Sequence, residues 1–345
     1  MGVSKPERRT YNSIDLCKFF MAILVVAIHT RPQQSCSSHI LLKIYELTVQ
    51  MAVPFFFFSS GFLLASKFDP DDNAANIRIT AAYLCRFIKM YLLWCAIYFP
   101  FSVYYYVTFR SGISFLHIIA SYVRCLLCIG GHYNAYQLWY LLSTIYSLIL
   151  VIVLLRCKLS SKMWGVVITV LCALSLFMDY LAGYEGPMSG ALRILKLLVG
   201  YTTVDGRVLQ GFFLIPAAML MRKNRISFKT CLLLFAVSTC LDYFLDNSSV
   251  SSVLTFLRTA AFFRMILQID LKDRPVYPVM RLISTDMYLI HMYVWIIYSA
   301  LMDGAKRYGF DSFAVTTVGC VAIGLLHSRF GRKKAPAAGK HLETA

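Results

Sequence analysis

The chain has 345 residues, of which 59% are hydrophobic and only 15% are charged. A soluble domain normally carries about 25% charged residues, so the composition excludes an ordinary soluble enzyme and predicts an all-α, polytopic membrane protein. The net charge of +17 does not indicate nucleic-acid binding, because Lys and Arg separate the apolar runs instead of gathering on one segment, as is typical of membrane topology.

The first apolar run covers residues 14–30 and carries Asp15, Lys18 and His29. Lys18 and His29 are almost three whole helical turns apart, so they share one face of a helix and lie about 16 Å apart along its axis. Ionisable groups are costly inside a bilayer and usually face a bundle interior or a wet cavity, which makes this face a candidate site. In the alternative interpretation, Asp15 and Lys18 reach one membrane interface and His29 lies at the other.

Further apolar runs of about the length that a bilayer requires follow along the chain. They cover residues 46–66, 83–107, 136–156, 163–182, 206–221, 230–246, 252–269, 281–302 and 312–328. We therefore predict about ten transmembrane helices within a domain of residues 1–334, followed by a polar tail, 335–345.

Residues 113–129 are also apolar, and whether they cross the membrane decides the topology. If they crossed, every later loop would change sides, and the excess of Lys and Arg in the cytoplasmic loops would reverse from there on. The positive-inside rule therefore favours ten spans with both termini in the cytoplasm, and a segment 113–129 that lies on the outer face. In that segment His117 and Arg124 share one helical face, which suits an interfacial or cavity-lining role.

The cysteines do not predict a disulfide framework, because most of the eleven lie inside apolar runs, where Cys is a small buried hydrophobe. Cys125 and Cys128, with His117 and His132 nearby, form the one grouping that resembles a metal site. It lacks a second Cys pair or a paired-His motif, so no metal is expected.

Helix-breaking, polar or charged residues interrupt the second and third apolar runs. Pro54 and Ser60 break the second, which is tolerated where neighbouring helices or a cavity satisfy the backbone, although plain helix packing is the alternative. Arg86 and Lys89 lie one turn apart at the start of the third. They are either topology anchors or a cationic site for a phosphate-bearing donor.

The fourth, eighth and ninth runs carry the remaining candidates. Gln137 and Tyr140 open the fourth run at the predicted outer interface, where an aromatic belt also explains the Tyr residue. Arg258 lies in the eighth run, and Asp286 and His291 lie in the ninth. Arg258 needs a partner or a wet cavity, and Asp286 is a candidate partner; a structural ion pair is the alternative to a catalytic role.

Several segments, in order along the chain, resemble the acyltransferase 3 family of ten-span membrane proteins: IDLCKFFMAILVVAIH, VPFFFFSSGFLL, CRFIKMYLLW, QLWYLL and STDMYLIH. The segments VVAIHTRP, AVPFFF, QLWY and DGRVLQGFF are similar to the membrane half of the vancomycin-resistance serine racemases. Those proteins carry a soluble racemase domain after the last span; this sequence stops at Ala345, so pyridoxal-phosphate racemisation is not expected. Lys18 stands where the family usually has Arg, and Gln137 where a His is expected.

The resemblance implies a membrane O-acyltransferase that moves an acyl group, most simply acetyl, from acyl-CoA to a hydroxyl of an extracytoplasmic carbohydrate or other envelope acceptor. His29 would be the general base or a transient acyl carrier, and Asp15 and Lys18 would shape the donor channel. Arg86 and Lys89 would hold the CoA phosphates. Further expected substrate-binding residues are Ser60, Gln137, Tyr140, His291, Arg258 and Asp286.

A substrate-binding or transport module, for example for serine, is the alternative, and the lack of an internal repeat counts against it. We expect a multi-pass protein of the cytoplasmic membrane of a bacterium, with acyl-CoA as a donor substrate and no bound cofactor. The expected partners are the lipid bilayer, acyl-CoA and the carbohydrate acceptor, and not nucleic acid, with a homodimer left open.

Overall fold

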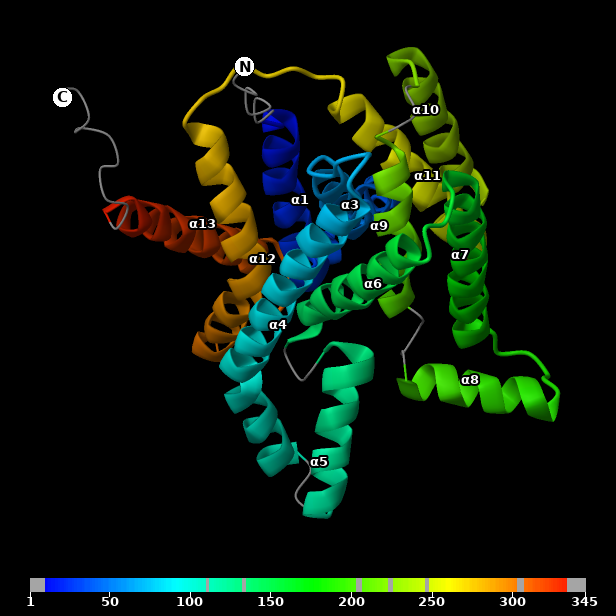
Figure 1. Cartoon of the computed structure of the whole chain (residues 1–345). Coiled ribbons are helices and arrows are strands. Elements are labelled where there is room, and N and C mark those ends of the chain that lie inside the picture. Colours follow the sequence, from blue (N-terminus) through cyan, green and yellow to red (C-terminus); the bar gives the residue numbers. More distant parts are fainter. Residues whose placement is uncertain are drawn as a thin grey trace, which may run out of the picture. The chain divides into compact units, whose positions relative to one another are not determined.

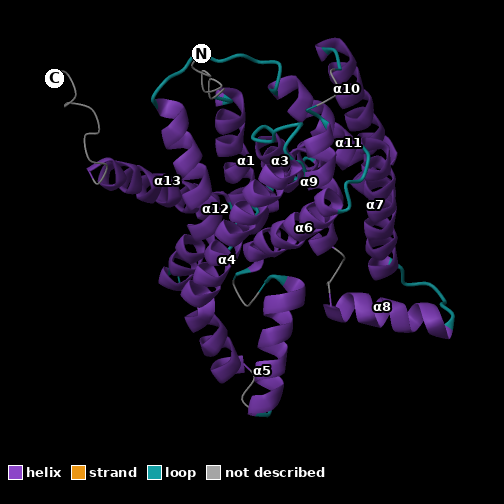
Figure 2. Cartoon of the chain, in the orientation of Figure 1, coloured by secondary structure: helices purple, strands orange, loops and turns teal. Residues whose placement is uncertain are grey.

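A computed structural model describes residues 10–109, 112–131, 135–202, 207–222, 226–245, 248–302 and 307–333. Every regular element within these ranges is a helix (Figure 1), and Figure 2 shows the same elements coloured by type. The predicted all-α class is therefore confirmed for the described part of the chain. The predicted tail, 335–345, lies outside the described residues.

Seven helical segments among the described residues are long and apolar enough to cross a membrane. They are Asn12–Thr30, His39–Ala65, Asn73–Phe109, Tyr136–Arg156, Ser161–Gly183, Phe228–Leu245 and Phe310–Phe330. Helices also occupy the other three predicted runs, but α9 (Gln210–Leu220) is short, and α11 (Ser248–Ile266) and α12 (Val276–Leu301) are not among the seven. The chain is a membrane protein, and the count of ten stays a prediction.

The chain divides into two units, and residues 1–42 and 266–345 form the first. It contains α1 (Asn12–Thr30), α12 and α13 (Phe310–Lys333), which pack against one another. Asp15 contacts Arg281 near the starts of α1 and α12, and His29 contacts His291 further along both, so these two helices run parallel. α13 returns antiparallel to α12, because His327 pairs with Asp286 while Asp311 pairs with Tyr298.

α1 ends where its sequence dictates. Arg31 adopts a left-handed conformation with φ 49°, and its N–H bonds the Ala27 carbonyl, which is a common way to close a helix. Pro32 then prevents the helix from continuing. The N–H of Gly309 donates to the Thr30 carbonyl at 2.9 Å, so the start of α13 is joined to this end of α1. His29 is thereby held in the last turn.

Residues 43–265 form the second unit. Its helices, in full or in most of their length, are α2 (His39–Val49), α3 (Ala52–Ala65), α4 (Asn73–Phe109), α5 (Phe115–Arg124), α6 (Trp139–Arg156), α7 (Ser161–Gly183), α8 (Gly190–Thr202), α9, α10 (Phe228–Leu245) and α11. α3 is buried along most of its length and packs on α9. A Cβ on Gly61 would lie 2.3 Å from the Ile215 carbonyl oxygen, so only glycine permits this approach.

Hydroxyl groups join α6 to the start of α9. Ser143 donates to the Val208 carbonyl at 2.6 Å and accepts from the Gly211 N–H at 3.0 Å, and Ser147 donates to the Gly211 carbonyl at 2.8 Å. In a membrane, such bonds satisfy backbone groups that lipid would leave unpaired.

Two helical features differ from prediction. The run 46–66 is two helices, α2 and α3, separated at residues 50–51. α8 was not predicted, because Arg193 and Lys196 interrupt its apolar residues and it has only 13 residues. Most of the segment 113–129 is helical: it contains α5, which is followed by a π-helical turn, Cys125–Ile129.

Candidate functional site

The first candidate site is a cluster of charges near the starts of α1 and α12. Asp15 is 4% exposed, and its carboxylate accepts hydrogen bonds from Nε of Arg281 at 2.9 Å and from Nη2 at 2.5 Å. The planar guanidinium matches a carboxylate with two parallel bonds, which satisfies the buried charge. Lys18, one turn further along α1, interacts electrostatically with both groups. Two of the predicted residues therefore lie in a three-charge cluster.

Arg281 was not among the candidates that the sequence indicated. A signal was present in the chain: α12, like α1, carries a basic residue about three turns before a His, Arg281 before His291 and Lys18 before His29. Two helices with this spacing, packed in parallel, bring the charged groups together at one level and the imidazoles together at another.

The imidazoles of His29 and His291 are the second cluster. Their ring centroids lie 5.1 Å apart, with 37° between the ring planes. His291 is fully buried, and its Nδ1 lies 3.0 Å from the Met287 carbonyl oxygen. A proton on Nδ1 donates to that carbonyl, which leaves Nε2 as an acceptor; Nε2 has no hydrogen-bond partner among the described residues. His29, by contrast, is half-buried.

In the second unit, the structure brings Ser60 and Tyr140 together. Their hydroxyl oxygens lie 2.9 Å apart, and the Tyr140 hydroxyl also approaches the Phe56 carbonyl at 3.4 Å. The Tyr140 ring packs against Phe57 at 4.7 Å. Gln137 is buried one turn before Tyr140. Ser60 and Tyr140 therefore join α3 to the start of α6, and Tyr140 and Gln137 are buried instead of lying in an exposed aromatic belt.

The predicted pairing of Arg258 with Asp286 is wrong. Arg258 and Asp242 are 1% and 3% exposed, and Nη1 of Arg258 lies 2.7 Å from the Asp242 carboxylate. Nη2 of Arg258 donates to the Thr255 hydroxyl at 3.1 Å. Asp286 instead lies 2.8 Å from Nδ1 of His327. Arg258 thus has a buried partner of the opposite sign, as a charge buried among helices requires, although that partner is Asp242 and not Asp286.

Arg86 and Lys89 are both exposed on α4, one turn apart. Lys67 lies over the Tyr83 ring, with Nζ 5.3 Å from the centroid, and Arg86 interacts electrostatically with the same tyrosine. We call Lys67, Arg86 and Lys89 the basic patch. Its guanidinium and ammonium groups suit the binding of phosphates.

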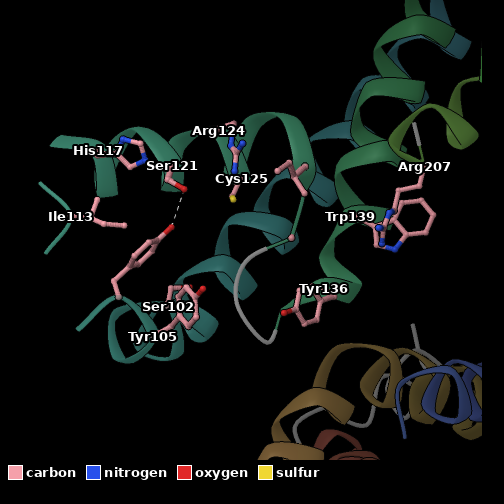
Figure 3. A pocket seen from close by; sticks show the side chains of 13 residues that line it. Ser102, Tyr105, Ile113, His117, Ser121, Arg124, Cys125, Tyr136, Trp139 and Arg207 are labelled. Carbon is pink, nitrogen blue, oxygen red and sulfur yellow. Dashed lines mark hydrogen bonds between the residues drawn. The ribbon is translucent and has the colours of Figure 1, made fainter. Parts of the chain in front are cut away.

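A cavity of about 480 Å³ lies in the second unit between α4, α5 and the start of α6 (Figure 3). His117 and Arg124 both line it, so of the two roles that their shared face suits, interfacial or cavity-lining, the structure shows the second. Cys125 is also in its wall. No metal-binding group of three or more His, Cys, Asp or Glu residues occurs in the described ranges, and His132 lies outside them.

The comparison with protein families decides which class of protein carries these clusters. A family model described as an acyltransferase domain matches residues 11–329, which includes α1 and its His29 as well as α12 and its His291. The chain belongs to the acyltransferase 3 family. The resemblance predicted from five sequence segments is therefore shown over nearly the whole chain.

Two curated proteins of Enterococcus faecalis, each described as an amino-acid racemase, are similar to parts of this member of the family. One is 35% identical over 146 residues, which are 42% of this chain and 20% of the racemase. The other is 28% identical over 139 residues, 40% of this chain and 18% of the racemase. The chain thus spans about a fifth of these relatives. No solved structure matches it significantly.

Proposed function

We propose that the protein is a membrane O-acyltransferase that moves an acyl group, most simply acetyl, from acyl-CoA to a hydroxyl of a carbohydrate or other envelope acceptor. The observation that carries the proposal is the contact of His29 with His291, at 5.1 Å between ring centroids, within a chain of the acyltransferase 3 family. Acyl transfer to a hydroxyl needs a base that removes the hydroxyl proton as the oxygen attacks.

His29 is the proposed base. Its neutral imidazole accepts the proton of the acceptor hydroxyl while the oxygen bonds to the thioester carbonyl carbon. The carbon–sulfur bond then breaks, and the thiolate of CoA takes the proton from the imidazolium, so the products are an ester and CoA thiol. His291 is the proposed positioning residue, since its buried ring lies against His29 and is itself oriented by the Met287 carbonyl.

The other candidates receive supporting roles. The basic patch, with Arg86 and Lys89, is proposed to hold the phosphates of CoA. Lys18 supplies positive charge to the thioester or phosphate oxygens, and the Asp15–Arg281 pair holds the start of α1 against α12. Ser60, Gln137 and Tyr140 are proposed to bind substrate through hydrogen bonds. We assign Arg258, which forms an ion pair with Asp242, and Asp286, which contacts the His327 imidazole, to folding.

We further propose ten spans with both termini in the cytoplasm of a bacterium. The parallel packing of α1 and α12 supports this topology, because two parallel spanning helices require an odd number of crossings between them. Ten spans place seven crossings there. A crossing at 113–129 would make eight and would require α1 and α12 to be antiparallel.

The test is acetyl-CoA binding and hydrolysis by the full chain in detergent. His29→Ala should lower hydrolysis by roughly 100-fold or more, the contribution typical of a general base, without changing acetyl-CoA binding. Arg86→Ala with Lys89→Ala should weaken binding. His39→Ala, an exposed histidine at the start of α2, is the matched control and should change neither. Full activity in His29→Ala, or no acetyl-CoA binding by a folded sample, contradicts the proposal.

A second candidate function is recognition or transport of an amino acid such as serine, which the partial similarity to amino-acid racemases favours. This function would use the polar residues of the helices without an acyl donor. Uptake of labelled serine into proteoliposomes that persists in His29→Ala would favour transport over acyl transfer.

A further inference from the structure

The cavity in the second unit has the size and lining of a small-molecule site. Its volume of about 480 Å³ falls within the range of roughly 300–1,000 Å³ that is typical of ligand pockets. Figure 3 shows its walls: Ser102 and Tyr105 on α4 face His117 and Ser121 on α5, and Tyr136, Trp139 and Arg207 close another side. Three separate helices and the segment before α9 therefore converge on one space.

The aromatic side chains of this wall suit a sugar ring. Tyr105, Tyr106, Tyr136 and Trp139 all line the cavity. Aromatic rings of Tyr and Trp combine a large apolar face with a polar group at one end. The carbon–hydrogen face of a pyranose packs on the apolar faces, and its hydroxyl groups bond to the polar ends and to Ser102 and Ser121. A purely apolar ligand would leave the Ser102 hydroxyl unsatisfied, because it is buried without a hydrogen-bond partner among the described residues, whereas Tyr106 donates to Ser121 at 3.1 Å.

The charges of the wall select an anion. Arg124 and Arg207 line the cavity, and none of its 13 lining residues is Asp or Glu. Arg124 is held in place, because its guanidinium lies 4.2 Å from the centroid of the Tyr201 ring and Nη1 donates to the Tyr201 carbonyl at 3.2 Å. Nε of Arg124 is buried and has no hydrogen-bond partner among the described residues. A guanidinium that is held in place and has an N–H group without an acceptor is suited to bind a carboxylate or phosphate.

We propose that this cavity binds a monosaccharide unit that bears a carboxylate or phosphate group. The aromatic residues recognise the ring, and Arg124 and Arg207 recognise the anionic group. The inference deepens the proposed function, and rests on it, where it makes this anionic sugar the acyl acceptor. Binding itself requires no acyl transfer, so it is measured separately.

Binding is measured by titration calorimetry on the full chain in detergent, with glucuronate, glucose 6-phosphate, glucose and glycerol phosphate as probes. Glucuronate or glucose 6-phosphate should bind saturably. Glucose, which lacks the charge, and glycerol phosphate, which lacks the ring, should each bind at least about tenfold more weakly. Arg124→Gln and Arg207→Gln should each weaken the binding of the anionic sugars by about tenfold. Tyr105→Leu should weaken the binding of every sugar but not that of glycerol phosphate.

Arg156→Gln is the matched control, because Arg156 is exposed at the far end of α6 and outside the cavity; it should leave binding unchanged. Arg124→Lys keeps the positive charge and should retain part of the affinity if Arg124→Gln destabilises the chain. Glucose that binds as tightly as glucuronate overturns the proposal. Glycerol phosphate that binds as tightly as the anionic sugars also overturns it, in favour of a lipid-headgroup site.

The same sample separates the two proposals. Acetyl-CoA binding without saturable binding of either anionic sugar overturns the cavity inference and leaves the acyltransferase proposal standing. Sugar binding that depends on Arg124, in a sample that does not bind acetyl-CoA, supports the cavity site and contradicts acyl transfer.

Discussion

The carboxylate of Asp15 and the guanidinium of Arg281 form a bidentate ion pair, although the two residues are 266 positions apart in the sequence. This pair fixes α1 and α12 side by side near their starts. Because the two helices run parallel, the same packing brings His29 against His291 further along. One buried carboxylate therefore sets the register of the helices that carry the proposed base and its positioning residue.

Arg281→Ala should lower the free energy of unfolding by about 1–3 kcal/mol, because it leaves the Asp15 carboxylate buried without its cation. This loss of stability is smaller than that expected for a fully buried ion pair, because the Arg281 side chain is partly exposed. Thermal unfolding in detergent measures it. Arg274→Ala, an exposed arginine just before α12, is the control and should have the stability of the wild type. An Arg281→Ala variant as stable as Arg274→Ala would contradict the assigned role.

Gly61→Ala should destabilise the second unit, because the added Cβ would meet the Ile215 carbonyl oxygen and the Ala218 side chain where α3 packs on α9. Overpacking of this kind typically costs about 1–3 kcal/mol. Gly165→Ala in α7 is the matched control, since no neighbouring atom lies within 4 Å of its added Cβ. Alanine favours a helix over glycine by up to about 1 kcal/mol, so Gly165→Ala should be neutral or stabilising in the same unfolding assay.

The sequence was sufficient for features that a short segment determines by itself. Each predicted apolar run contains a helix within the described residues, because length and hydrophobicity are local properties, and the shared face of His117 and Arg124 follows from helical period alone. α8 escaped prediction for a local reason too: Arg193 and Lys196 break its apolar residues, although its other face is apolar.

Partner choice could not be predicted in the same way. The sequence showed that Arg258 needed an anion and offered Asp286, but the helix that packs against it carries Asp242. It likewise showed that Asp15 was an ionisable group near a membrane helix, without identifying Arg281. Such pairs depend on which helices meet, and a hydrophobic pattern that is almost continuous around a helix does not specify that.

The link between the start of α1 and the segment before α12 should weaken in acid. Asn12 and Thr10 donate hydrogen bonds to the Asp273 carboxylate at 2.6 and 2.7 Å, and these bonds hold the pKa of that carboxyl below its ordinary value of 3.8. A lowered pKa in the folded state means that the stabilisation is complete above pH 3.8 and is lost as the pH falls through the folded-state pKa. The protection of residues 10–14 against hydrogen exchange, taken relative to the intrinsic exchange rate at each pH from pH 6 to pH 3, should fall at the acid end.

Asp273→Asn removes the titrating group and should abolish the acid-dependent part of this change. Asp71→Asn, at another exposed carboxylate, should retain it. An acid-dependent loss of protection that is the same in Asp273→Asn as in the wild type would show that another group is responsible.

Arg258 and Asp242 provide a test between a structural and a substrate-binding role. Arg258→Met should lower the free energy of unfolding by about 3–5 kcal/mol, because it leaves the Asp242 carboxylate buried and unpaired. The double variant Arg258→Met with Asp242→Leu removes both charges and should recover most of that loss, since an apolar pair of similar volume often replaces a buried ion pair without cost. Unfolding in detergent measures stability, and acetyl-CoA hydrolysis measures function in the same samples. If the pair is structural, the double variant hydrolyses acetyl-CoA at the wild-type rate; a folded but inactive double variant would instead make Arg258 a substrate-binding residue.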